Sequence, residues 1–197
     1  MNNQKRHSAE EIRGEVDRFY REISTGERKS LSADRLYSSL GYDPALVEQL
    51  PREVRLGLSC GNPLESLELQ PGETLLDLGS GVGMDVFMAR LKFPEAGTIY
   101  GLDRLPEMIR KAELIKNKKK YENIVFKVGT LTDMPFEDAS IDAIISNCVV
   151  NLEPDKQKVY DEIYRVLKPG GRFIISDITL KQRLSDEIMA DPNVYGT

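Results

Sequence analysis

The chain has 197 residues, of which 40% are apolar and 30% charged, and it carries a formal net charge of -5 with a pI near 5.1. This length fits one domain with a substantial core. The acidic balance gives no electrostatic footprint for nucleic acid, and the apolar runs fall far short of the ~20 residues that a membrane-spanning helix needs. We therefore expect neither nucleic acid nor a membrane as a partner.

The chain contains two cysteines, Cys60 and Cys148, and the first nine residues are polar, without the apolar stretch of an export signal. We therefore expect a cytoplasmic protein. In that reducing compartment, paired thiols bind ligands or react more often than they form a structural disulfide. A disulfide between the two cysteines remains the alternative.

Residues 1–70 are expected to form an N-terminal helical extension. Ser8 and Glu11 have the spacing of a capping box, and apolar residues at helical intervals continue to about Ile23. The pattern predicts a packing helix there, then a polar loop over 24–36 and short helical pieces over 37–69, which glycines and prolines interrupt. Cys60 lies in the turn-forming word SCGNP, which places it on an adaptable loop.

Residues 71–197 alternate between short apolar runs and helical patterns. The runs 74–78, 98–102, 124–128, 143–146 and 172–176 are strand candidates, and 84–91, 106–116 and 155–167 are helix candidates. This alternation predicts an α/β domain with a mainly parallel sheet, covered by helices on both faces. Ligands of such sheets bind beyond the carboxyl ends of the strands.

The stretch 74–85, with the sequence TLLDLGSGVGMD, predicts a strand, a tight turn and a helix start. Gly79, Gly81 and Gly83 let the backbone turn sharply and let a ligand approach closely. Asp103 ends the next strand 20 positions after Gly83, where a carboxylate can accept hydrogen bonds from ribose hydroxyls. The dinucleotide fingerprint requires a third glycine at the position of Met84, so the pattern argues against NAD.

The spacing G-x-G-x-G after an acidic residue resembles the S-adenosylmethionine motif of class I methyltransferases, which have a Rossmann-like fold. The resemblance implies that the glycine turn faces the amino-acid tail of this cofactor. Asp77 would orient its ammonium group, and Asp103 its ribose. Leu131 and Thr132 would contact the adenine, while Asp133 is either part of that site or an ordinary loop residue. A glycine turn without a ligand is the alternative interpretation.

Several short words of the sequence occur together in one family. They are Leu36-Tyr37-Ser38, Gly41-Tyr42, Cys60-Gly61-Asn62-Pro63, Gly72-Glu73, Leu76-Asp77-Leu78-Gly79-Ser80-Gly81, Ser146-Asn147-Cys148 and Leu167-Lys168-Pro169-Gly170-Gly171. Over roughly residues 37–177 the chain resembles the arsenite methyltransferase family. CGNP and SNCVVNL are the specific words, whereas LKPGG and the glycine turn occur in many small-molecule methyltransferases.

The resemblance implies that Cys60 and Cys148 bind trivalent arsenic and that no other metal is required. Arsenic(III) is thiophilic, and thiolates displace its hydroxide or glutathione ligands. The bound arsenic keeps a lone pair that can attack the sulfonium methyl group without a general base. Catalysis would come chiefly from proximity and alignment. Arsenite or its thiol conjugates would be the substrate, and the family implies a thiol reductant.

The chain departs from the family pattern at several positions. It has no cysteine pair upstream of Cys60, Ser59 replaces the usual glycine, and Thr132 stands where relatives commonly have Glu. Relatives also continue beyond Thr197 with a further arsenic-binding cysteine. We therefore expect a chain shortened at its C-terminal end, just after DPNVYGT, whose sheet lacks its final strands.

Two other functions fit the same sequence. The first is a carbon or oxygen methyltransferase of the quinone-biosynthesis type, which shares the glycine turn and LKPGG but needs neither cysteine. The second is a core that binds arsenic or S-adenosylmethionine without turnover.

Overall fold

The computed structural model describes residues 8–25, 27 and 33–181. The first helix, α1 (Ala9–Thr25), begins with the predicted capping box. The Ser8 backbone N–H donates to Glu11 Oε2 over 2.8 Å, and the Glu11 N–H donates to Ser8 Oγ over 3.2 Å. Two helix donors are thus satisfied reciprocally, and the prediction of this helix is confirmed.

Three short helices follow: α2 (Ala33–Ser39), α3 (Pro44–Gln49) and the 3-10 helix η1 (Arg52–Val54). The predicted loop over 24–36 is wrong from Ala33 onward. Tyr37 explains the difference, because its side chain is fully buried and its hydroxyl accepts a hydrogen bond from the Gly57 N–H. Tertiary packing therefore outweighs the polar character of the preceding residues.

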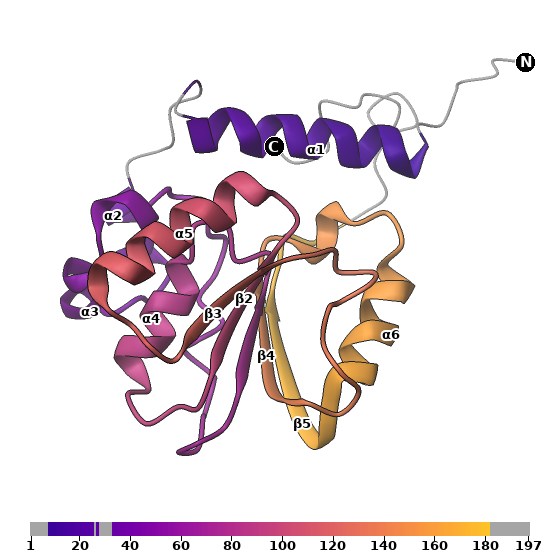
Figure 1. Cartoon of the computed structure of the whole chain (residues 1–197). Coiled ribbons are helices and arrows are strands. Elements are labelled where there is room, and N and C mark those ends of the chain that lie inside the picture. The colour runs from indigo at the N-terminus through magenta and orange to yellow at the C-terminus, as the bar shows by residue number, and fades with distance from the viewer. Residues whose placement is uncertain (1–7, 26, 28–32, 182–197) are drawn as a thin grey trace, which may run out of the picture.

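Five parallel strands form one sheet in the order β3-β2-β1-β4-β5 (Figure 1). The strands are β1 (Leu75–Leu78), β2 (Ile99–Asp103), β3 (Ile124–Val128), β4 (Ile141–Asn147) and β5 (Leu167–Ser176). β4 begins two residues earlier than predicted and β5 five residues earlier. The early start of β5 contains the LKPGG word, in which Gly170 adopts φ +82°.

Helices cover the two faces of the sheet separately. α4 (Met84–Lys92) and α5 (Pro106–Lys119) lie on one face, and α6 (Lys156–Val166) lies on the other, as Figure 1 shows. Leu75 packs with α4 and α5, whereas Leu76 and Leu78 pack with α6, as the alternation of strand side chains requires. The predicted Rossmann-like parallel sheet with helices on both faces is confirmed.

Part of the N-terminal extension shares the core of the sheet domain. Tyr37, Val47 and Leu64 belong to the same buried cluster as Leu75 and Phe87. The predicted loss of final strands and the word DPNVYGT lie outside the described residues. Among the helices that the structure describes, none has the length and apolar character to cross a membrane.

The interior strand β4, which lies between β1 and β5, should carry much of the stability. Ile144 is fully buried between β1 and α6, so Ile144→Ala should lower the free energy of unfolding by roughly 2–5 kcal/mol through lost burial and a residual cavity. Urea denaturation would measure this. The control Leu114→Ala, at a side chain 70% exposed, should change stability by less than about 0.5 kcal/mol. Equal effects of the two substitutions would contradict the assignment of this core.

Candidate functional site

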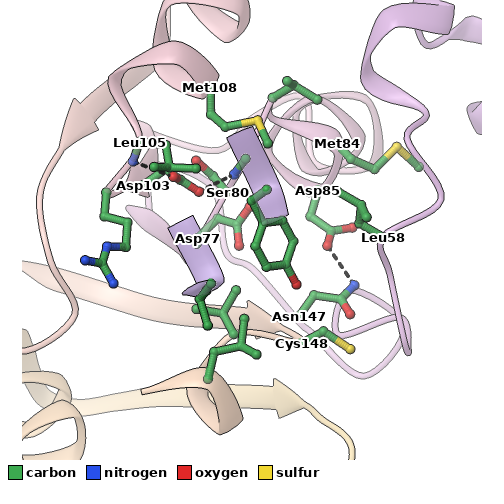
Figure 2. Close-up of a pocket in the computed structure, with 18 of the residues that line it drawn as sticks. Leu58, Asp77, Ser80, Met84, Asp85, Asp103, Leu105, Met108, Asn147 and Cys148 are labelled. Atoms are coloured by element: carbon green, nitrogen blue, oxygen red, sulfur yellow. Dashed lines mark hydrogen bonds between the residues drawn. The ribbon is translucent and has the colours of Figure 1, made fainter. Parts of the chain in front are cut away.

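A pocket lies at the carboxyl ends of β1, β2 and β4, where the sheet changes winding direction. Figure 2 shows Asp77, Asp85 and Asp103 around this pocket, with Asn147 and Cys148 on another side. Cys60 is not among the lining residues, although its neighbours Leu58 and Ser59 are. The pocket is therefore acidic on one wall and has a cysteine on another.

The three glycines of the turn, Gly79, Gly81 and Gly83, have different structural roles. Gly79 adopts φ +71°, and a Cβ there would lie 2.2 Å from the Val149 side chain. Gly81 adopts φ +53°, and its missing Cβ would point into open space. Both residues line the pocket, but Gly83 does not. Gly83 instead starts α4 at φ +90°, where a Cβ would collide with Phe126, so it serves helix packing.

Asp103 holds the turn in place from the end of β2. Its Oδ2 accepts a hydrogen bond from the Gly81 N–H, and its Oδ1 accepts one from the Leu105 N–H, each over 2.9 Å. Burial raises the pKa of Asp103, and the two backbone donors partly oppose that rise. Each carboxylate oxygen can accept more than one hydrogen bond, so both can still receive hydroxyl donors from a ligand.

Asp77 is the most deeply buried carboxyl group of the pocket, with 3% of its surface exposed. Burial raises its pKa well above the ordinary value, and the nearby carboxylates of Asp85 and Asp103 raise it further. No hydrogen bond among the described residues acts in the opposite direction. A cation placed here would stabilise the ionised form, so the pocket favours a positively charged ligand group.

The loop after β3 contributes one of the two predicted adenine contacts to the pocket. Leu131 lines it together with Gly129 and Thr130. Thr132 is not among the lining residues, and Asp133 forms an isolated backbone bridge with Thr130. That bridge closes the loop on itself and accounts for a structural role of Asp133.

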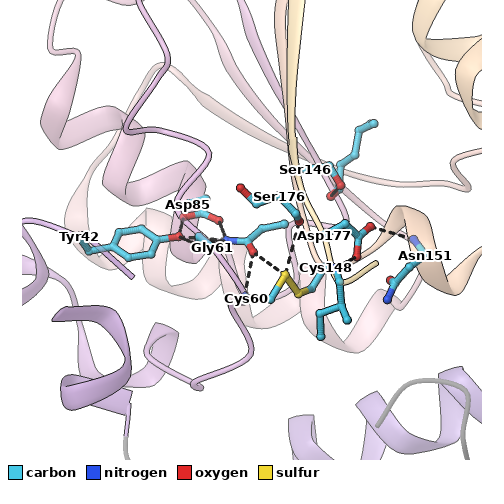
Figure 3. The surroundings of a disulfide bond; sticks show 12 residues. Tyr42, Cys60, Gly61, Asp85, Ser146, Cys148, Asn151, Ser176 and Asp177 are labelled. Atoms are coloured by element: carbon cyan, nitrogen blue, oxygen red, sulfur yellow. Dashed lines mark hydrogen bonds between the residues drawn. A yellow bond between two sulfur atoms is a disulfide. The ribbon is translucent and has the colours of Figure 1, made fainter. Parts of the chain in front are cut away.

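The two cysteines meet beside the pocket, although 88 positions separate them. Their Cα atoms are 5.8 Å apart, and the side chains are joined by a disulfide, which Figure 3 shows. Cys148 adopts φ +57°, a region that few non-glycine residues occupy. Its N–H donates to the Ser176 carbonyl over 2.8 Å, so the end of β5 supports this unusual conformation.

A buried network that the sequence did not reveal connects the Cys60 loop to α4. The Tyr42 hydroxyl donates to Asp85 Oδ1 over 2.6 Å, and the Asn147 amide donates to Asp85 Oδ2 over 2.9 Å. Asn147 also donates to the Gly61 carbonyl and accepts the Cys60 N–H over 3.1 Å. Burial raises the pKa of Asp85, and the hydrogen bonds from Tyr42 and Asn147 partly oppose that rise. The only sequence signal was the position of Asn147 immediately before Cys148.

Helix α1 contributes to the pocket wall as well as to packing. Arg13, Asp17 and Tyr20 line the pocket. Arg13 pairs with the buried Glu153 over 2.5 Å, and Asp17 pairs with Arg104 over 3.0 Å. Sequence reasoning predicted the helix but missed these lining residues, because Arg13 and Asp17 resemble an ordinary solvated face and Tyr20 resembles a packing position.

Asp77 should make the ligand-free protein less stable at high pH. A carboxyl group whose folded pKa is raised supports folding below its ordinary pKa of 3.8, and this support is lost as the pH rises through the folded value. Asp77→Asn removes the charge, so its melting temperature should exceed that of the wild type at pH 8. Each kcal/mol added to the free energy of unfolding should raise the melting temperature by about 2–4 °C, and this increase should shrink toward pH 5.

Calorimetric melting across this range measures the effect, with the exposed Asp161→Asn as the matched control. A difference between Asp77→Asn and wild type that stays constant with pH would contradict the assignment of Asp77 as a buried anion.

Comparison with known proteins places this fold and pocket in context. The family described as "Methyltransferase domain" matches residues 69–197. The arsenite methyltransferase of Halobacterium salinarum is 46% identical over 154 residues, which are 78% of this chain and 39% of that protein. The arsenite methyltransferase of Aquipseudomonas alcaligenes is 36% identical over 191 residues, which are 92% of this chain and 55% of that protein.

A solved structure agrees with these relatives. The arsenic(III) S-adenosylmethionine methyltransferase of Chlamydomonas reinhardtii is 33% identical, with a TM-score of 0.66, over 77% of this chain and 54% of that one. The chain thus spans about half, or less, of the length of these relatives. The match over residues 69–197, carried on a parallel sheet of the predicted kind, shows that this chain belongs to the methyltransferase-domain family.

Proposed function

We propose that the chain is the catalytic core of an S-adenosylmethionine-dependent methyltransferase that methylates trivalent arsenic bound to Cys60 and Cys148. One observation carries the proposal: two cysteines 88 positions apart meet at the pocket of a methyltransferase domain, and Cys148 lines that pocket. The names of the relatives from Halobacterium salinarum, Aquipseudomonas alcaligenes and Chlamydomonas reinhardtii support the same substrate.

The donor half of the site consists of the glycine turn and the acidic wall. S-adenosylmethionine would supply the methyl group, and its positive charge suits the pocket wall that contains Asp77, Asp85 and Asp103. Asp77 would hold the ammonium group and Asp103 the ribose hydroxyls. The open space at Gly81 would admit the amino-acid tail. Leu131 and Thr132 remain the proposed adenine contacts, of which Leu131 faces the pocket.

The acceptor half requires the dithiol form of the cysteine pair. A thiol reductant would open the disulfide, and the two thiolates would then displace oxygen or glutathione ligands from arsenite or its thiol conjugates. Thiolates suit this soft acceptor better than oxygen or nitrogen ligands do. Holding both reactants at one pocket accounts for rate enhancement by proximity. A cytoplasmic location would keep the thiols available.

We further propose that the two halves come from different parts of the chain. Residues 71–197 would form the cofactor-binding core, with Asp77, Asp103 and Cys148. Residues 1–70 would act as an extension that adds Cys60 and Tyr42. The hydrogen bonds that Asn147 makes to this extension support such a division of labour.

Replacing either cysteine should separate arsenic chemistry from cofactor binding. Cys60→Ser and Cys148→Ser should each abolish arsenite-dependent methyl transfer, because one thiolate cannot hold arsenic in place. Affinity for S-adenosylmethionine should change by less than about threefold, since neither sulfur belongs to the donor half. Mass analysis of methylated arsenicals and calorimetric titration of the cofactor would measure the two effects.

Undiminished methyl transfer in either variant would refute the thiol site and favour a carbon or oxygen methyltransferase. A wild-type protein that binds both ligands and yields no methylated product would contradict transfer and favour a binding core. Protection of the two thiols from alkylation by arsenite gives an independent measurement of the acceptor site.

Replacing Asp103 should affect cofactor binding and leave arsenite binding unchanged. Asp103→Asn removes the anion that holds both the turn and the proposed ribose, so affinity for S-adenosylmethionine should fall by about ten- to a hundredfold. Arsenite protection of the thiols should not change. Calorimetric titration compares this variant with the exposed Asp161→Asn, and equal cofactor affinities would argue against the ribose contact.

A further inference from the structure

Asp177 lies directly beside the cysteine pair, immediately after β5 ends at Ser176. Figure 3 shows its carboxylate between Cys148 and Asn151. The three ligand atoms, the two sulfurs and one Asp177 oxygen, all lie within 4.8 Å of one another. Asp177 is the last residue of the segment that resembles the arsenite methyltransferases, but no word of that resemblance includes it. The fold therefore adds an oxygen atom to the thiol site.

Backbone donors fix the direction of this carboxylate. The Asn151 N–H donates to Asp177 Oδ2 over 2.9 Å, and the Ile178 N–H donates to Oδ1 over 2.9 Å. Burial raises the pKa of Tyr20, which lines the pocket, to about 12, and the charges of Asp103 and then Asp177 contribute to this rise. Asp177 is thus an oriented anion whose field reaches the pocket.

The chemistry of arsenic(III) determines whether Asp177 binds the arsenic atom itself or accepts a hydrogen bond from one of its substituents. A soft arsenic(III) centre prefers thiolates to a carboxylate as ligands. Two cysteine thiolates fill two of its three positions, and arsenite that is bound by this pair alone keeps one hydroxyl group. A carboxylate is a strong acceptor for that hydroxyl, because hydrogen bonds to charged groups are the stronger ones.

Building on the proposed function, we propose that Asp177 is a catalytic residue that accepts a hydrogen bond from the arsenic hydroxyl and then takes its proton. The lone pair of arsenic forms the As–C bond, the donor S–C bond breaks, and its electron pair stays on sulfur. Arsenic is oxidised from III to V, and the transferred methyl group formally takes up the two electrons. The hydroxyl proton moves to Asp177, which leaves a neutral As=O group.

This step is separate from the attack itself, which needs no base because arsenic supplies its own lone pair. The need for a base arises afterwards, because the methylated arsenic carries a positive charge that makes its hydroxyl acidic. An arsenical with a methyl group in place of the hydroxyl has no such proton. The role of Asp177 should therefore depend on the third substituent of arsenic.

Binding of two arsenicals to the reduced protein tests this dependence. The probes are arsenite and methylarsonous acid, without S-adenosylmethionine and in a phosphine reductant, so that no external thiol takes the third position. Asp177→Asn should weaken arsenite binding by about ten- to a hundredfold and leave methylarsonous acid binding unchanged. Thiol-to-arsenic ultraviolet absorption would follow both titrations. Asp161→Asn is the matched control, because it makes the same change on the exposed surface of α6.

Each outcome bears on the proposal. Weakening of arsenite alone supports it, and the unchanged methylarsonous acid arm also shows that the variant is folded. Equal weakening of both arsenicals would mean that Asp177 only shapes the loop, and no weakening of either would mean that it does not touch the hydroxyl; both results overturn the proposal. Cys60→Ser distinguishes a failure of the thiol site itself, since it should abolish binding of both arsenicals.

Single-turnover methylation supplies a second measurement. Asp177→Asn should slow methyl transfer to arsenite by about a hundredfold, as expected for the loss of a general base. Transfer to methylarsonous acid should keep the wild-type rate, because no hydroxyl proton leaves. Equal slowing with both acceptors would contradict proton transfer to Asp177.

Discussion

Both the cofactor half and the cysteine half of the site depend on the hydrogen bonds of the Asn147 side chain. Its amide nitrogen lies within hydrogen-bond distance of Asp85, the Tyr42 hydroxyl and the Gly61 carbonyl, and its oxygen accepts the Cys60 N–H. One residue at the end of β4 therefore joins the helix after the glycine turn to the loop that carries Cys60. Since Cys148 follows it directly, Asn147 also fixes where the two sulfurs meet.

Burial of like charge is the second constraint. Asp77, Asp85 and Asp103 lie around one pocket, and burial raises the pKa of each. Two side-chain donors partly oppose the rise in the pKa of Asp85, and two backbone donors do the same for Asp103. Asp77 accepts a hydrogen bond of neither kind among the described residues. The ligand-free pocket therefore leaves one carboxylate for a cation, which is the property that a sulfonium or ammonium ligand would use.

The sequence predicted most of the fold and only part of the site. Strands and helices of the sheet domain followed from apolar periodicity, because buried parallel strands are nearly continuous apolar runs. α2 was missed because the burial of Tyr37 depends on distant residues. Asp85 resembles an ordinary acidic residue in the first turn of a helix, and Asp177 resembles any polar residue after a strand. Their roles depend on three-dimensional proximity, which local patterns do not contain.

The end of β5 positions the acceptor site in a way that no single motif could. The Ser176 carbonyl accepts a hydrogen bond from the Cys148 N–H. The side chain of Ser176 leaves room only for glycine at position 61, and Asp177 follows Ser176 in the chain. A Cβ on Gly61 would lie 2.7 Å from the Ser176 Cβ. The close approach of these two backbones is what brings Cys60 to Cys148. The same strand end therefore sets the distance between the sulfurs and places the carboxylate beside them.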